Sequence, residues 1–140
     1  NLEKALELYN KGLEISEQLV TEVSTTESKR DLSVSYNNVA GIYEAIGGKE
    51  NLEKALELYN KGLEISEQIL ESEKTVQAYE DLIVSLYNIA THEYTSKNTA
   101  IEFLHEALRI ANMLYDNTKM VRHQNIVSIL INELNKRTEI

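Results

Sequence analysis

The sequence predicts an all-α chain of about six helices, arranged as a solenoid of antiparallel helix pairs. The first observation behind this prediction is an internal repeat. The segment NLEKALELYNKGLEISEQ occupies residues 1–18 and recurs unchanged at residues 51–68, which sets a period of 50 residues. The second is that apolar residues return every three or four positions, as on one face of a helix. The third is a composition without proline and with only five glycines, which suits long helices joined by short turns.

The ends of the expected helices are signalled locally. The pair Gly47-Gly48 ends one helix, because glycine accepts the left-handed conformation that closes helices. Asn51 then opens the next helix as its expected N-cap. The expected helices cover about 1–22, 29–46, 51–73, 76–95, 98–116 and 119–137. The expected domain is a single array over 1–140, made of a second helix (helix B) of a truncated unit at 1–22, units at 29–73 and 76–116, and a final helix at 119–137.

The repeat extends beyond the identical segment. DLSVSYNNVAGIY, starting at Asp31, aligns with DLIVSLYNIATHE, starting at Asp81. A degraded third copy follows, in which residues 100–110 align with 55–65 and residues 126–129 align with 83–86. A single helix pair cannot bury its own apolar face, so these units are expected to stack as neighbours.

At these residues the chain resembles the tetratricopeptide-repeat (TPR) family, in a bacterial variant with a long period. The period of 50 residues exceeds the common one of about 34, and the proline that usually follows the second helix is absent. The resemblance implies a right-handed solenoid in which the first helix of each pair (helix A) lines a concave groove for peptides. The matching positions are Tyr36, Val39, Ala40 and Tyr43 on helix A, and Ala55, Tyr59 and Gly62 on helix B.

Composition and motifs argue against catalysis, nucleic-acid binding and membrane insertion. The net charge of −9 would repel a phosphate backbone, and no apolar run is long enough to cross a bilayer. The absence of cysteine fits a reducing compartment, so a cytoplasmic protein is expected. Glu102 and His105 have a helical metal-site spacing, but no second Glu-x-x-His motif accompanies them. We therefore expect no catalytic residues, no cofactor and no metal.

The candidate groove residues lie on the helices A that the resemblance identifies. Asn38 and Asn88 occupy the same place in successive units, and an amide offers both a donor and an acceptor to a peptide backbone. The alternative, that each asparagine bonds a neighbouring helix, is equally open. The aligned positions Val34, Val84 and Val127 carry no basic residue, so a carboxylate clamp is not expected. The remaining groove candidates are Val34, Asn37, Tyr87, Thr91 and Tyr94.

The sequence thus predicts a protein–protein interaction scaffold that binds a peptide or partner segment. Two alternatives stay open: a regulatory or sensor module of a larger effector protein, and an architectural array that stacks on itself. Because the chain begins on a helix B, we interpret it as a fragment of a longer array. End-to-end association is then expected, between residues 1–20 of one molecule and the 119–137 helix of another, whose run from Ile126 to Leu134 is apolar on more than one side.

Overall fold

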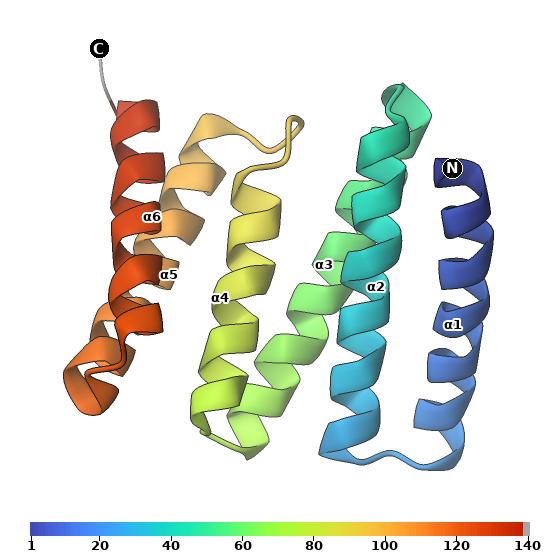
Figure 1. Cartoon of the computed structure of the whole chain (residues 1–140), viewed down its shortest axis with the longest axis horizontal. Helices are drawn as coiled ribbons and strands as arrows, with labels where there is room; N and C mark the ends of the chain where they lie inside the picture. The colour runs from blue at the N-terminus through green and yellow to red at the C-terminus, as the bar shows by residue number, and fades with distance from the viewer. Residues whose placement is uncertain (139–140) are drawn as a thin grey trace. The chain divides into compact units, whose positions relative to one another are not determined.

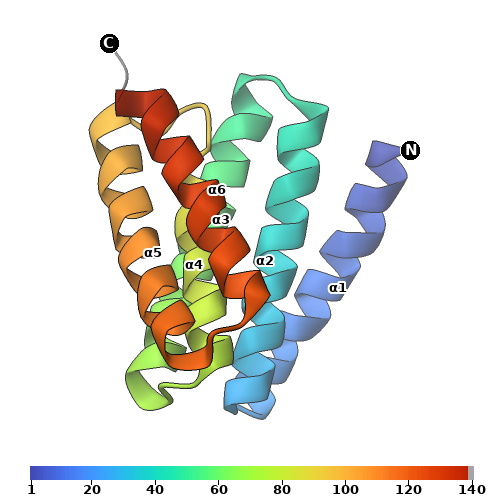
Figure 2. The same cartoon turned by 60° about the vertical axis from the view of Figure 1, so that its left-hand side comes forward.

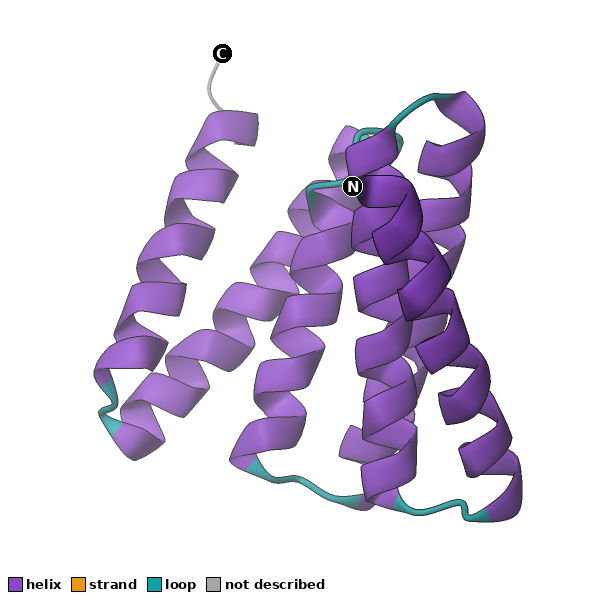
Figure 3. Ribbon diagram, turned by 45° about the vertical axis from the view of Figure 1, so that its right-hand side comes forward, coloured by secondary structure: helices purple, strands orange, loops and turns teal. Residues whose placement is uncertain are grey.

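The computed structural model describes residues 1–138 and confirms the all-helical class. Six helices and no strand are found in this range (Figures 1 and 3). The helices are α1 (Leu2–Glu22), α2 (Thr26–Ile46), α3 (Lys49–Ser72), α4 (Val76–Ala90), α5 (Lys97–Thr118) and α6 (Val121–Thr138).

The helices fall into two compact units. The first, Asn1–Glu73, holds α1, α2 and α3, and the second, from Lys74 onwards, holds α4, α5 and α6. In the first unit α2 packs against both α1 and α3, and in the second α5 packs against both α4 and α6. Consecutive helices within each unit run antiparallel (Figure 1), and Figure 2 shows the short turn that joins α5 to α6. The expected pairs α2–α3 and α4–α5 are therefore present, whereas one continuous solenoid stays a prediction.

Two helices begin before their expected starting residues, and in one of them a side-chain cap is the reason. Helix α2 begins at Thr26 rather than near 29, because Thr25 and Ser28 form a reciprocal capping box. Helix α3 begins at Lys49, with Gly48 as its N-cap, so the prediction that Asn51 is the cap is wrong. The Asn51 side chain instead donates to the Gly47 carbonyl at 2.9 Å. The repeated residue Asn1 does cap its helix, accepting from the Lys4 amide at 2.9 Å.

Helix α4 ends at Ala90, five residues before the expected end at about 95. The reason is a set of side-chain hydrogen bonds that take up carbonyls of the last turn. The Thr91 hydroxyl donates to the Tyr87 carbonyl at 2.8 Å, and the Thr95 hydroxyl donates to the Ile89 carbonyl at 2.6 Å. Tyr94 consequently lies in the turn after α4 rather than on a helix.

The two identical segments form α1 and α3 but use different faces against α2. Helix α1 contributes Leu6, Leu13 and Val20 to a core cluster with Leu32 and Tyr36 of α2. Helix α3 packs Leu58 and Ile65 against the same cluster, and it also meets α2 through small and polar residues. The Ser33 hydroxyl donates to the Gly62 carbonyl at 3.3 Å, and the Tyr59 hydroxyl donates to Glu44 at 2.9 Å. The sequence predicts that the two copies are equivalent helices B. In the structure, α1 and α3 contact α2 through different faces of the repeated segment.

Helix α6 is apolar mainly on the side that faces the other helices of the second unit. Its buried residues His123, Leu130 and Leu134 recur at helical spacing. Ile129 and Ile131 are half-exposed, but a stripe of exposed polar residues runs along the rest of the helix. These are Asn125, Ser128, Asn132 and Asn135. The prediction that this helix is apolar on more than one side thus rests on the two isoleucines and on Val121, which is exposed at the start of the helix.

Candidate functional site

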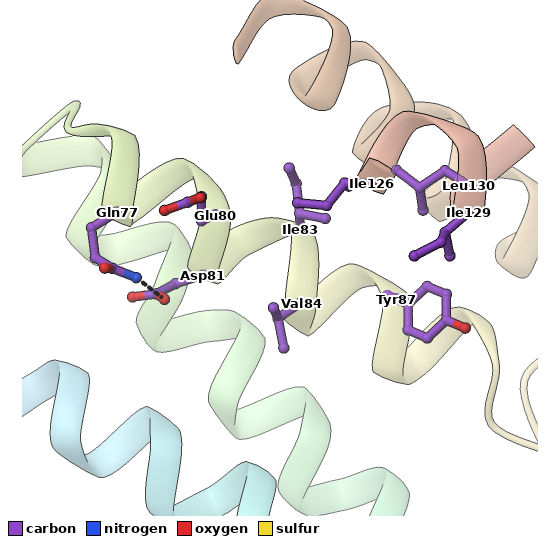
Figure 4. A pocket seen from close by; sticks show the side chains of 9 residues that line it. All are labelled: Gln77, Glu80, Asp81, Ile83, Val84, Tyr87, Ile126, Ile129 and Leu130. Carbon is purple, nitrogen blue, oxygen red and sulfur yellow. Dashed lines mark hydrogen bonds between the residues drawn. The ribbon is translucent and has the colours of Figure 1, made fainter. Parts of the chain in front are cut away.

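An open groove of about 460 Å³ lies within the second unit, between α4 and α6. Figure 4 shows isoleucine and leucine side chains of α6 opposite the side chains of α4 that form the other wall. The lining residues are Gln77, Glu80, Asp81, Ile83, Val84 and Tyr87 of α4 with Ile126, Ile129 and Leu130 of α6.

The middle and one end of the groove are apolar. Ile83 and Leu130 form a buried floor, while Val84 and Ile129 are each 50 % exposed. The ring of Tyr87 lies beside Ile129 at this end (Figure 4). Exposed aliphatic side chains around a buried apolar floor lower their free energy when another apolar group covers them. The arrangement suits an apolar side chain of a partner, with the Tyr87 hydroxyl as a polar neighbour.

The opposite end of the groove is fixed by hydrogen bonds to Glu80. Its carboxylate accepts from Arg122 Nε at 2.7 Å and pairs with His123 Nε2 at 2.9 Å. The His123 ring is fully buried, and its Nδ1 lies 2.6 Å from the Thr118 hydroxyl. These bonds join α4 to α6 and to the end of α5, so they hold the two walls of the groove in place.

Two carboxylates of this unit titrate below their usual range. Burial alone would raise the pKa of Glu80, but the hydrogen bonds from Arg122 and His123 outweigh it and lower the pKa. On α6, the hydrogen bond from Arg137 lowers the pKa of Glu133 against a smaller opposing effect of burial. A carboxyl whose pKa is lower in the folded state stabilises the fold above the ordinary glutamate pKa. That stabilisation disappears as the pH falls through the lowered pKa.

We therefore expect the second unit to lose stability in acid through Glu80. The melting temperature of the wild-type chain should fall more steeply between about pH 5 and pH 2 than that of Glu80→Gln, which has no carboxyl to protonate at this place. Thermal unfolding followed by circular dichroism measures both slopes. Equal slopes would show that the contacts of Glu80 do not favour its ionised form.

The predicted groove residues separate into different places. Tyr87 lines the groove, and Asn88 follows it as a half-buried residue of α4. Val34 and Asn38 are exposed on α2, in the first unit. Asn37 lies elsewhere: its side-chain oxygen is buried, faces Gly62 of α3, and has no hydrogen-bond partner among the described residues. Thr91 is the C-cap of α4, and Tyr94 is an exposed residue of the following turn.

The polar end of the groove, formed by Glu80, Arg122 and His123, was not predicted from the sequence. Glu80 and Arg122 lie 42 positions apart, and no repeat relates them. His123 is at the expected start of the last helix, but only the structure shows that it is buried against Glu80. The sequence gives one indication of the α6 wall, because Ile126 and Ile129 align with Ile83 and Leu86 of α4.

The other two histidines, His92 and His105, lie outside the groove. His92 is buried and accepts from the Tyr94 amide at 2.9 Å, and His105 is exposed. Within residues 1–138, no group of three or more histidine, aspartate and glutamate side chains is placed to hold a metal ion. None of the helices in that range combines the length and apolar character needed to cross a membrane.

Comparison of the chain with family models, curated proteins and solved structures finds no match.

Proposed function

We propose that this protein is an interaction scaffold whose α4–α6 groove binds an apolar side chain of a peptide or partner segment, without catalysis. The observation that carries the proposal is the apolar groove itself. Val84 and Ile129 stay half-exposed on walls that Glu80, Arg122 and His123 hold together. A preformed groove binds with a smaller loss of conformational entropy than one that must be ordered first.

The repeat supports a wider architecture for this scaffold, a right-handed solenoid of the TPR kind. The identical segments at 1–18 and 51–68, and the aligned segments that start at Asp31 and Asp81, repeat the same residue pattern at a period of 50. In such an array α2, α4 and α6 are the helices A, and the groove lies between two of them. The resemblance assigns peptide binding to this side.

The ligand that suits the groove is a segment with one large aliphatic or aromatic anchor. The lining residues Ile83, Ile126 and Leu130 offer hydrocarbon surface without a hydrogen-bonding group. The polar residues at the far end are engaged: Glu80 by Arg122 and His123, and Asp81 by the Gln77 amide at 2.8 Å. Affinity should therefore depend on the anchor more than on charge.

Selection from a displayed peptide library, followed by titration of the enriched peptides, tests this proposal. We expect Val84→Lys to weaken their binding at least about tenfold, because the charged group enters the apolar groove. Val34→Lys is the matched control, since Val34 holds the aligned position on α2 and is similarly exposed but is not among the residues that line the α4–α6 groove. Both variants should keep the wild-type melting temperature, because exposed substitutions change stability little. Failure to enrich peptides with an apolar anchor, or equal affinity of both variants, would overturn the proposal.

A further inference from the structure

The carboxylate of Glu80, at the edge of the α4–α6 groove, has one oxygen that can accept a further hydrogen bond. The two short bonds, with Arg122 Nε at 2.7 Å and with His123 Nε2 at 2.9 Å, both go to Oε2. Among the described residues, Oε1 receives only Arg122 Nη2 at 3.5 Å, which is longer than an ordinary N–H···O bond. A carboxylate has about four lone-pair sites, so Oε1 has room for another donor.

The surroundings of Glu80 strengthen a hydrogen bond made at this oxygen. The side chain is 18 % exposed, so little water competes for it. Burial would raise the pKa of Glu80, but the hydrogen bonds from Arg122 and His123 lower it. The carboxylate is therefore ionised at neutral pH, and an ionised carboxylate accepts hydrogen bonds without donating any. A ligand group that meets Oε1 has to supply a donor.

Hydrocarbon surface begins one helical turn from this acceptor. Glu80, Ile83 and Tyr87 follow each other at three- and four-residue spacing on α4, which places neighbouring Cβ atoms about 5–6 Å apart. Figure 4 shows the Ile83 side chain close to Ile126 of α6. The groove volume of about 460 Å³ lies within the range of pockets that hold small organic groups, about 300–1,000 Å³. A flat two-ring side chain can thus cover both isoleucines and reach the carboxylate with its edge.

We propose that the anchor of the bound segment is a tryptophan whose indole N–H donates to Oε1 of Glu80. The inference rests on the proposed function, because it specifies the side chain that enters the same groove. An indole combines a large hydrocarbon surface with one donor and no acceptor, so Glu80 satisfies its only polar atom. Leucine, isoleucine and phenylalanine anchors cover the groove but bring no donor to Oε1.

Other side chains that carry a donor fit less well. A tyrosine hydroxyl can donate to Glu80, but its oxygen also has acceptor lone pairs, and the isoleucine and leucine side chains of the groove offer no donor to them. A lysine or arginine would bring a positive charge next to Arg122, whose guanidinium already contacts the same carboxylate. An indole avoids both costs, and most of its contact with the groove is apolar.

Two peptides that differ only at the indole nitrogen test this hydrogen bond. One is the tightest tryptophan-containing peptide from the displayed library. The other replaces that tryptophan with 3-benzothienylalanine, which has sulfur in place of the N–H and nearly the same shape. We expect the replacement to weaken binding at least about tenfold in calorimetric titrations, because a hydrogen bond to a charged group is lost. The chain contains no tryptophan, so a shift of the indole emission to shorter wavelength on binding can be assigned to the peptide.

Two variants of the chain assign the effect to Glu80. Glu80→Gln makes the acceptor neutral and should reduce the penalty for benzothienylalanine at least about threefold. Glu102→Gln, at an exposed position of α5 in the same unit, should keep the full penalty. Circular dichroism melts check that both variants are folded at the temperature of the titration. If Glu80→Gln is unfolded there, the two peptides on the wild type decide the question.

The possible outcomes separate this inference from the proposed function. Enrichment of aliphatic or phenylalanine anchors in place of tryptophan, or equal affinity of the two peptides for the wild type, would overturn the tryptophan anchor and leave groove binding intact. Binding without a shift of the indole emission would also overturn it, because the indole would then remain in water. Failure to enrich any peptide with an apolar anchor would overturn both.

Discussion

Tyr59→Ala should lower the free energy of unfolding by about 3–5 kcal/mol, the range for truncating a buried aromatic side chain. Tyr59 of α3 is only 5 % exposed, and its hydroxyl donates to Glu44 of α2. Burial and the hydrogen bond to Glu44 raise the pKa of the Tyr59 phenol, so its hydroxyl stays protonated and donates to that carboxylate. The substitution removes the apolar contacts and leaves Glu44 without this donor. Chemical unfolding in urea, followed by circular dichroism, measures the loss.

The duplicated sequence provides an unusually close control for this prediction. Tyr9→Ala changes the same residue in the same local sequence, but its ring is 48 % exposed, so we expect a loss below about 1 kcal/mol. Glu57→Ala, at an exposed position of α3 two residues before Tyr59, should be near neutral. Similar losses for Tyr59→Ala and Tyr9→Ala would show that the two copies have equivalent surroundings, contrary to the structure.

The second large effect is expected at Glu80. Glu80→Ala removes the acceptor of Arg122 Nε and the partner of His123 Nε2, and the buried imidazole loses its contact with a carboxylate. A lost hydrogen bond to a charged group costs about 1.5–3 kcal/mol, so we expect a loss in that range. Because Glu80 also joins the groove walls, peptide affinity should fall together with stability.

The control for Glu80 is an exposed glutamate of the same unit. Glu102→Ala removes a carboxylate from the surface of α5 and should change the free energy of unfolding by less than about 0.5 kcal/mol. Urea unfolding of both variants at neutral pH provides the comparison. Equal changes would mean that the contacts of Glu80 with Arg122 and His123 contribute nothing to the fold.

The helical class could be predicted because its signals are local. Apolar residues at three- and four-residue spacing mark all six helices, and Gly47 and Gly48 end α2 with positive φ angles of 81° and 88°. The early end of α4 escaped prediction, because periodicity does not show that Thr91 and Thr95 bond backbone carbonyls. Such competition between side chain and backbone depends on rotamers that a pattern of residue types leaves open.

The groove could be predicted only in part, because it depends on contacts between helices that are distant in the sequence. Tyr87 was a candidate from its place on helix A, but the opposite wall depends on how α6 is turned against α5. The pairing of Glu80 with Arg122 and His123 joins positions more than 40 residues apart and leaves no periodic trace. Burial of the repeated tyrosine could not be predicted at all: Tyr9 is exposed and Tyr59 is buried, although both lie in the same 18-residue sequence. Composition and spacing cannot distinguish two identical segments that have different neighbours.

Methyl NMR of the intact chain, titrated with the tightest peptide selected from the library, tests peptide binding in the α4–α6 groove most directly. We expect the largest shifts at the methyl groups of Ile83, Val84, Ile126 and Ile129, which line the groove. The methyl groups of Val34 and Ile15, exposed on α2 and α1, should stay unchanged. Shifts confined to the first unit, or absent from the groove at saturation, would contradict the proposed function.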